Sequence, residues 1–316
     1  MLPVVKKQLV SERTGLLLAL VVLGGGWGAT QPLGKIATST GHPPFGLIFW
    51  QLVICTLVLG GISLVRGRGL VFTKPALRFY VIIAVIGTLI PNAAFYASVT
   101  RLPAGIMSIL ISTVPLMAFP LALMLRIDRF TMRRLFGLLL GLAGVALIAL
   151  PASSLPDPAM AAFLPLAMIG PLFYAMESTY VARYGMAGMD PVQAMFGASL
   201  AGVILCLPVT LATDQWIAPM TPVGRAEQAL ILSSAIHSML YAGYVGLAAR
   251  AGAVFASQSS YLVTASGVFW AMALLDERFS PMVWAALVVM LSGVALVQPR
   301  SNPKAVQNPG DAVRVI

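Results

Sequence analysis

The chain has 316 residues, of which 59% are hydrophobic and 9% are charged, and its mean hydropathy is +0.92. In soluble domains about a quarter of the residues are charged. The values found here exclude a water-soluble domain and place the chain in a lipid bilayer. The net charge of +10 does not indicate a nucleic-acid partner, because the basic residues lie at the ends of apolar segments and not on one continuous face.

Ten apolar windows have the length of a membrane span, about 20 helical residues for a hydrocarbon core of about 30 Å. Lipid offers no partner to free backbone amides, and the windows lack the alternation of a barrel, so we expect helices. In chain order the windows are residues 15–37, 45–65, 76–99, 103–125, 132–150, 160–183, 191–212, 227–249, 252–275 and 280–298. In the fourth window, Pro115 and Pro120 are expected to kink the helix.

A stretch near the middle of the chain recurs near its end. Residues 126–147 match residues 275–296 without a gap at an offset of 149, and 8 of 22 positions are identical. Ten spans and one duplication give a repeat of five spans. Because five is odd, the second repeat must cross the membrane in the opposite direction to the first. We therefore predict two inverted five-helix repeats, residues 14–150 and 160–298, with tails at 1–13 and 299–316.

The basic residues predict the orientation. With a cytoplasmic N-terminus, 16 Lys and Arg residues fall on the inside and 4 on the outside, a bias that favours both termini in the cytoplasm. We expect a multi-pass protein of the bacterial inner membrane that is a monomer, since ten helices can enclose a pathway in one subunit.

Several kinds of chemistry lack their motifs. The sequence has no phosphate-binding G-x-x-x-x-G-K-[ST] loop, no Cys/His/Glu set with metal spacing, and no supported Ser-His-Asp arrangement. We therefore predict no ATP-driven engine, no metal, no cofactor and no enzymatic activity. Cys55 and Cys206 fall within apolar spans and are expected to be buried small hydrophobes and not disulfide partners.

Glu177 is the clearest functional candidate, because an ionisable group inside a membrane is costly and usually serves a function. We expect it to accept a proton or to bind a cationic group of a solute. The alternative is a carboxyl group that stays neutral or that reaches the interface near Arg183.

The internal repeat supports a second group of candidate functional residues. At the offset of 149, His237 corresponds to Thr88 and Tyr241 to Asn92. Each pair is spaced i, i+4 and so occupies one helix face, and two inverted helices would present matching polar faces to a shared cavity. A structural histidine is the alternative for His237. Pro91 frees a backbone carbonyl one turn back, as at helix breaks that line cavities.

The remaining candidates lie on other spans. Trp27 and Gln31 share a face of the first span, although Trp27 can equally be lipid-facing, and Lys35 is expected to be an interfacial anchor or a salt-bridge partner. Gln258 and Tyr261 mark a polar ninth span, whose serines also suit close helix packing. The predicted solute-binding residues are Trp27, Gln31, Asn92, Tyr96, Thr113, Tyr174, Glu177, His237, Tyr241, Gln258 and Tyr261.

The first span and the two polar corners resemble a known family. The sequence Leu23-Gly-Gly-Gly-Trp27, which continues to Lys35, and the corner Asp128-Arg129-Phe130-Thr131 are similar to segments of EamA-type members of the drug/metabolite transporter superfamily. The second corner, at residues 277–280, is similar as well. At both corners we expect helix caps that stabilise a gate, or else a solvated loop without a gating role.

The resemblance implies ten helices, inverted repeats and transport of small metabolites. We therefore expect a secondary transporter that moves a small organic solute outward by alternating access. Aromatic rings with few charges suit an amino acid or an amphipathic drug-like solute better than a phosphate. The alternatives are a proton-coupled importer, or a lipid flippase or non-transporting bundle.

Overall fold

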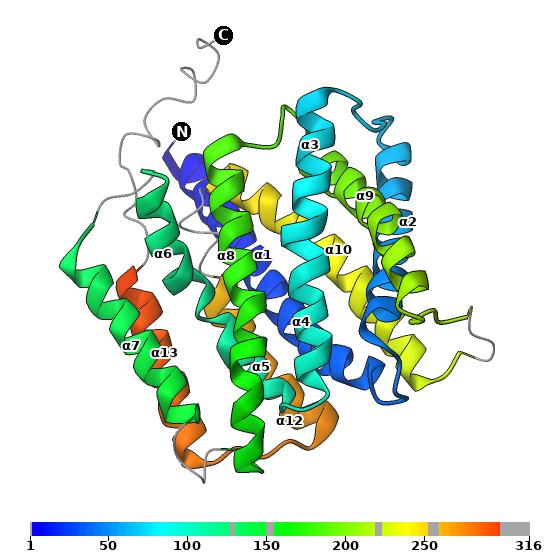
Figure 1. Cartoon of the computed structure of the whole chain (residues 1–316). Coiled ribbons are helices and arrows are strands. Elements are labelled where there is room, and N and C mark those ends of the chain that lie inside the picture. The colour runs from blue at the N-terminus through cyan, green and yellow to red at the C-terminus, as the bar shows by residue number, and fades with distance from the viewer. Residues whose placement is uncertain (1, 127–129, 150–154, 219–222, 252–258, 298–316) are drawn as a thin grey trace.

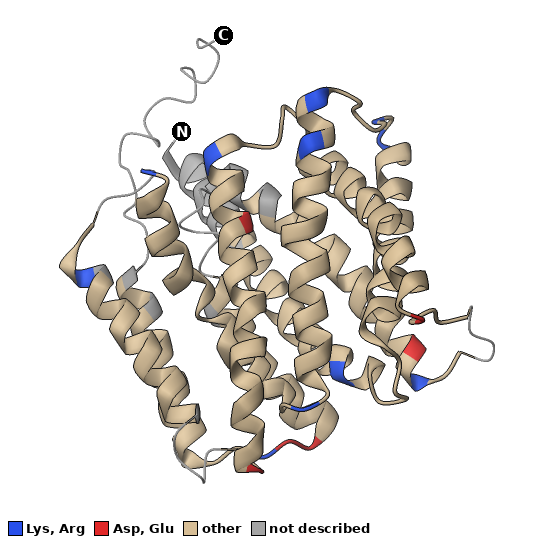
Figure 2. Cartoon of the chain, viewed as in Figure 1, with Lys and Arg blue, Asp and Glu red and all other residues tan. Residues whose placement is uncertain are grey.

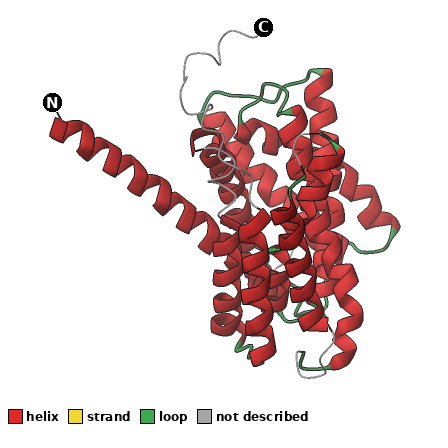
Figure 3. Ribbon diagram, turned by 90° about the vertical axis from the view of Figure 1, so that its left-hand side faces the viewer, coloured by secondary structure: helices red, strands yellow, loops and turns green. Residues whose placement is uncertain are grey.

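The structure is a computed structural model that describes residues 2–126, 130–149, 155–218, 223–251 and 259–297, and within them it is helical without any strand (Figure 3). The helices of the first half are α1 (Leu2–Ala37), α2 (Pro44–Val65), α3 (Lys74–Ile83), the π-helix η1 (Ala84–Leu89), α4 (Ile90–Val99), α5 (Ala104–Ile111), α6 (Val114–Met124) and α7 (Met132–Ala149). Those of the second half are the 3-10 helix η2 (Pro158–Phe163), α8 (Leu164–Tyr184), α9 (Pro191–Ala212), α10 (Arg225–Ala251), α12 (Ser259–Leu275) and α13 (Pro281–Val297).

These helices correspond to the predicted spans. Among the described residues, five stretches are long and apolar enough to cross a membrane, at 44–65, 74–99, 104–124, 158–184 and 191–212, and shorter apolar helices lie at 135–148, 262–275 and 281–293. Charged residues lie mainly at the two ends of the bundle (Figure 2). The helix α1 begins at Leu2 and so includes residues that the sequence assigned to the N-terminal tail.

Two of the expected spans are interrupted. The third span is α3, η1 and α4 in succession. The π-helix ends at Leu89, two residues before Pro91, and the Ile90 N–H donates to the Val85 carbonyl. The fourth span breaks between α5 and α6, where Ser112 and Thr113 precede Pro115. In both places a proline follows the irregular turn, because its ring cannot donate the backbone bond that a continuous α-helix needs.

The packing of the helices follows the duplication (Figure 1). The helix α7 packs against α13, and α2 packs against α9. The helix α1 lies against α10 and α12, as α8 lies against α4 and α6; α10 contacts α2 as α3 contacts α9. Exchanging each span for its counterpart in the other half reproduces these main contacts, so the two halves are related by a pseudo-twofold axis.

Close contacts between α7 and α13 show that the repeats are inverted. A Cβ atom added at Gly293 would lie 3.0 Å from the Gly141 amide nitrogen, and one at Gly144 would lie 2.1 Å from Cγ of Met290. The residue number rises along one helix as it falls along the other, so the helices are antiparallel. At the offset of 149, each of these two contacts is the image of the other, which confirms the predicted inverted architecture.

The ends of α2 and α9 also show that these two counterpart helices are antiparallel. Asp190 caps α9 by accepting from the backbone N–H groups of Val192 and Gln193, and its Oδ2 lies 3.0 Å from Nη1 of Arg68 at the end of α2. Partial burial raises the pKa of the Asp190 carboxyl, but the two amides and the Arg68 guanidinium outweigh burial and hold this pKa below its ordinary value. The start of one helix therefore meets the end of the other.

A polar network joins three segments at one end of the bundle. The Glu277 carboxylate accepts from the backbone N–H groups of Ala104 (2.7 Å) and Gly105 (3.0 Å), which cap α5. The Lys35 ammonium lies 3.3 Å from Glu277 and donates to the Leu102 carbonyl at 2.8 Å. Glu277 is thus a helix cap that also holds the end of α1 against the start of α5. The matching corner at Asp128 lies outside the described residues.

We predict that Gly293→Ala destabilises the contact between the repeats. The new Cβ would lie 2.6 Å from the Gly137 carbonyl oxygen, and backbone atoms cannot rotate away. Overpacking of this kind costs about 1–3 kcal/mol, so the melting temperature in detergent should fall. The control is Gly61→Ala on α2, where nothing lies within 4 Å; it should melt at the wild-type temperature or slightly above. Equal melting temperatures for the two variants would contradict the tight crossing.

Removing the cap at α5 should expose its first amides. Glu277→Ala leaves the N–H groups of Ala104 and Gly105 without their acceptor, and bonds to a charged group contribute about 1.5–3 kcal/mol each. Hydrogen exchange measured by mass spectrometry should quicken at these residues, and less so in Glu277→Gln, which keeps one acceptor oxygen. The exposed Arg278→Ala change should leave this exchange unaltered. Protection that persists in Glu277→Ala would rule out the cap.

Candidate functional site

Glu177 lies inside the bundle where three spans meet. Its side chain comes from α8, is 6% exposed, and accepts a hydrogen bond from the hydroxyl group of Tyr241 on α10. It also rests on η1, because a Cβ atom at Gly87 would lie 2.9 Å from the carboxyl carbon of Glu177. The π-helix and the missing side chain at Gly87 together make room for the carboxyl group between the spans.

Aromatic rings surround the Tyr241 side of this contact. The Trp27 ring of α1 lies 6.4 Å from the Tyr241 ring, 6.5 Å from His237 and 5.4 Å from Tyr244, between ring centroids. These three partners belong to α10, on successive turns of one helix face. Trp27 therefore packs inside the protein between α1 and α10 and does not face lipid alone.

Tyr241 and Asn92, which correspond to each other in the two repeats, each form a hydrogen bond with a residue of α8. Tyr241 binds Glu177, and its counterpart Asn92 accepts a hydrogen bond at 3.3 Å from the hydroxyl group of Tyr174. Tyr174 and Glu177 are three residues apart on α8, so they share a face. One helix thus connects the equivalent polar positions of the third and eighth spans.

Other predicted residues have different surroundings. Tyr96 donates at 2.9 Å to Oε1 of Gln51, and the Thr113 hydroxyl donates at 2.6 Å to the Leu110 carbonyl in the preceding helix, α5. Oε1 of Gln31 is buried with no hydrogen-bond partner in the described part of the chain. Gln258 lies outside the described residues, and only the backbone of Tyr261, within α12, is described.

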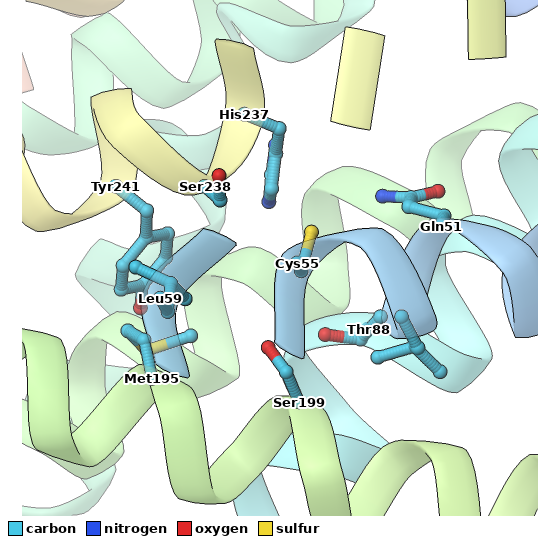
Figure 4. A pocket seen from close by; sticks show the side chains of 10 residues that line it. Gln51, Cys55, Leu59, Thr88, Met195, Ser199, His237, Ser238 and Tyr241 are labelled. Atoms are coloured by element: carbon cyan, nitrogen blue, oxygen red, sulfur yellow. The ribbon is translucent and has the colours of Figure 1, made fainter. Parts of the chain in front are cut away.

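A pocket lies beside Tyr241, between α2, η1, α9 and α10 (Figure 4). About 320 Å³ of space lies between its walls, including the part that is open to solvent. Its walls are formed by Gln51, Leu52, Cys55, Leu59, Thr88, Met195, Ser199, His237, Ser238 and Tyr241. The lining contains no Lys or Arg side chain.

The structure therefore brings Thr88, His237 and Tyr241 to one pocket. Glu177 is not part of the lining, but it accepts the hydrogen bond of Tyr241. Gln51 of α2 and Ser199 of α9 also line this pocket, and neither was among the predicted residues. Gln51 and Cys55 are spaced i, i+4, as are Met195 and Ser199. That spacing was the available signal, although it is weak within long apolar spans.

Comparison with known proteins agrees with this architecture. The model of the EamA-like transporter family matches the chain twice, at residues 13–150 and 162–298. The chain is 26% identical over 293 residues to the uncharacterized inner membrane transporter YedA of Escherichia coli strain K12, covering 90% of this chain and 89% of YedA. It is 22% identical over 300 residues to the uncharacterized transporter YvbV of Bacillus subtilis strain 168, covering 94% and 95%.

A solved crystal structure shares the fold, with a TM-score of 0.62, 17% identity, and coverage of 90% of this chain and 96% of the other. The two matches to the family model span most of the sequence and coincide with the two halves that pack as inverted copies. The chain belongs to the EamA-like transporter family, and it is a membrane transporter and not an enzyme.

Proposed function

We propose that this protein exports a small organic solute bearing an amino group, either an amino acid or an amphipathic amine, in exchange for protons. The observation that carries the proposal is the buried hydrogen bond between Glu177 and Tyr241, at the meeting point of the third, sixth and eighth spans. An ionisable group buried among membrane spans is energetically costly and usually serves a function.

The exchange follows from the chemistry of one carboxyl group. A protonated Glu177 is neutral, and the energetic cost of its burial is small. An ionised Glu177 needs a positive partner, which the ammonium group of a solute supplies. Because the same oxygen atoms take either the proton or the ammonium group, the two cargoes exclude each other, and each is carried in its own direction.

Alternating access would use the inverted repeats. The helices α1 and α8 occupy equivalent places, because each packs against the third and fourth spans of the other repeat. Rocking of one group of helices against the other would open either side in turn. The network of Lys35 and Glu277 then acts as the closed gate at one end. The bias in basic residues supports cytoplasmic termini, and the similarity to YedA supports a bacterial inner membrane. One subunit encloses the pathway, so we propose a functional monomer.

We predict that Glu177→Gln abolishes coupling to protons. Purified protein in liposomes should accumulate radiolabelled amino acids or amines against a gradient when a pH difference is imposed. In Glu177→Gln this accumulation should fall by at least about tenfold, because an amide neither binds nor releases a proton in this range. Tyr241→Phe, which removes the hydrogen bond to Glu177, should weaken coupling without eliminating it.

The matched control is Glu227→Gln, since Glu227 is also a carboxylate but pairs with His42 at 2.8 Å near the start of α10. It should leave coupling intact. Solute flux without any proton movement, unchanged in Glu177→Gln, would overturn the exchange mechanism. Uptake together with protons would indicate an importer, and movement of lipids with no movement of these solutes would indicate a flippase.

A further inference from the structure

Two basic side chains stand side by side on the exposed face of α3. Lys74 is the first residue of this helix, Arg78 lies one turn further along, and both are exposed. Residues four apart are neighbours on a helix, so these like charges repel each other. The start of a helix also favours acidic side chains, and the first turn of α3 has none. An anion bound between Lys74 and Arg78 would remove this repulsion.

The carboxylate nearest in the fold is already in use. Asp190 lies 3.0 Å from Arg68 and 3.6 Å from Arg66, the two arginines of the loop before α3, and it also caps α9. Within the described ranges, neither Lys74 nor Arg78 has an acidic partner. Residues 66–78 contain four Lys and Arg residues and no Asp or Glu, and Figure 2 shows basic residues together at this end of the bundle. The local excess of positive charge is therefore left for an external anion.

Apolar side chains continue the same exposed face of α3 towards the middle of the membrane. Leu77 and Val81 are 45% and 47% exposed, whereas Phe79 on the opposite face is buried against the bundle. An exposed apolar face within a membrane span meets acyl chains, and basic residues at the end of a span lie at the level of the lipid headgroups. The face formed by Lys74, Leu77, Arg78 and Val81 thus combines a site for an anion with a site for a hydrocarbon chain.

The duplication does not repeat this pair on the other side of the membrane. At the offset of 149, Lys74 corresponds to Val223 and Arg78 to Glu227, which pairs with His42. Because the repeats are inverted, the two equivalent faces lie at opposite membrane surfaces. The bias in basic residues predicts that α3 begins on the cytoplasmic side, where anionic lipids give the membrane surface a negative potential. The basic pair therefore belongs to the copy whose face meets these lipids.

We propose that the exposed face of α3 binds an anionic phospholipid, with the phosphate group between Lys74 and Arg78. One acyl chain of this lipid lies along Leu77 and Val81. A soluble phosphate would use the basic pair alone and would leave the adjoining apolar face without a role, so a lipid is the better match.

This lipid would hold a helix that leads directly to the transport site. The helix α3 continues into η1, where Gly87 leaves room for the carboxyl group of Glu177. Binding at the start of α3 therefore stabilises the wall on which Glu177 rests. The inference does not depend on which solute is carried or on proton exchange.

The test measures lipid binding to the purified full-length protein in detergent by native mass spectrometry. The probes are dioleoyl phosphatidylglycerol, which is anionic, and dioleoyl phosphatidylcholine, which is zwitterionic. The wild type should bind phosphatidylglycerol about tenfold more tightly. Lys74→Gln combined with Arg78→Gln should remove this preference, because each basic residue near an anionic lipid strengthens binding about fivefold. Lys74→Arg combined with Arg78→Lys keeps both charges and should retain it.

The matched control is Arg126→Gln combined with Arg133→Gln. It removes the same charge from two exposed arginines at the corner between α6 and α7, and it should bind phosphatidylglycerol as the wild type does. Hydrogen exchange then locates the site, since phosphatidylglycerol should slow exchange at residues 74–83 of the wild type and phosphatidylcholine should not. This second measurement decides the matter if the double Gln variant of α3 fails to fold.

Four outcomes would overturn the lipid site. Equal binding of phosphatidylglycerol by the wild type and the double Gln variant of α3 excludes it. An equal loss in the α6–α7 control assigns the effect to the total charge of the protein. Equal slowing of exchange by phosphatidylcholine removes the role of the anionic headgroup. Displacement of phosphatidylglycerol by glycerol 3-phosphate assigns the basic pair to a soluble anion instead.

Discussion

The hydrogen bond between Glu177 and Tyr241 is the interaction on which the proposed transport depends. A carboxyl group in the interior of a membrane protein must be protonated, paired or hydrogen-bonded. Here the partner comes from another span, and Gly87 in a π-helix provides the space. Any movement that separates α8 from α10 changes the surroundings of the carboxyl group. The reverse also holds, because gain or loss of a proton alters how strongly α8 holds α10.

The gene duplication accounts for the arrangement of the helices, whereas the polar groups of the site come from positions at which the two copies differ. At the offset of 149, Glu177 and Tyr174 of α8 correspond to Gly28 and Gly25 of α1. A Cβ atom at Gly28 would lie 2.1 Å from Oγ of Ser266, so that position is used for close packing between α1 and α12. The first copy therefore brings helices together where the second presents a carboxyl group. In the proposed transport, the symmetric framework opens to either side in turn, and the carboxyl group of Glu177 is present in the second copy alone.

Much of the fold follows from the sequence, because lipid permits few choices. Hydrophobic length, the duplication and its odd number of spans predict inverted helical repeats, and Pro91 and Pro115 predict the irregular third and fourth spans. The site was less predictable. Gln51 lies within a long apolar span and corresponds to Leu200 in the second copy, so the duplication gives no support to a role for it. Thr113 is polar and central, but its hydroxyl group donates to a backbone carbonyl of its own span. Sequence spacing does not distinguish these two uses of a hydroxyl group.

The number of protons exchanged for each solute molecule tests the central claim most directly. It can be measured in liposomes from the membrane potential at which net flux of the fastest-moving amino acid stops at a fixed pH difference. One carboxyl group shared by both cargoes predicts one proton for each amino acid, and a reversal potential that shifts accordingly with pH. A reversal potential independent of pH, or one that requires two protons, would contradict the account.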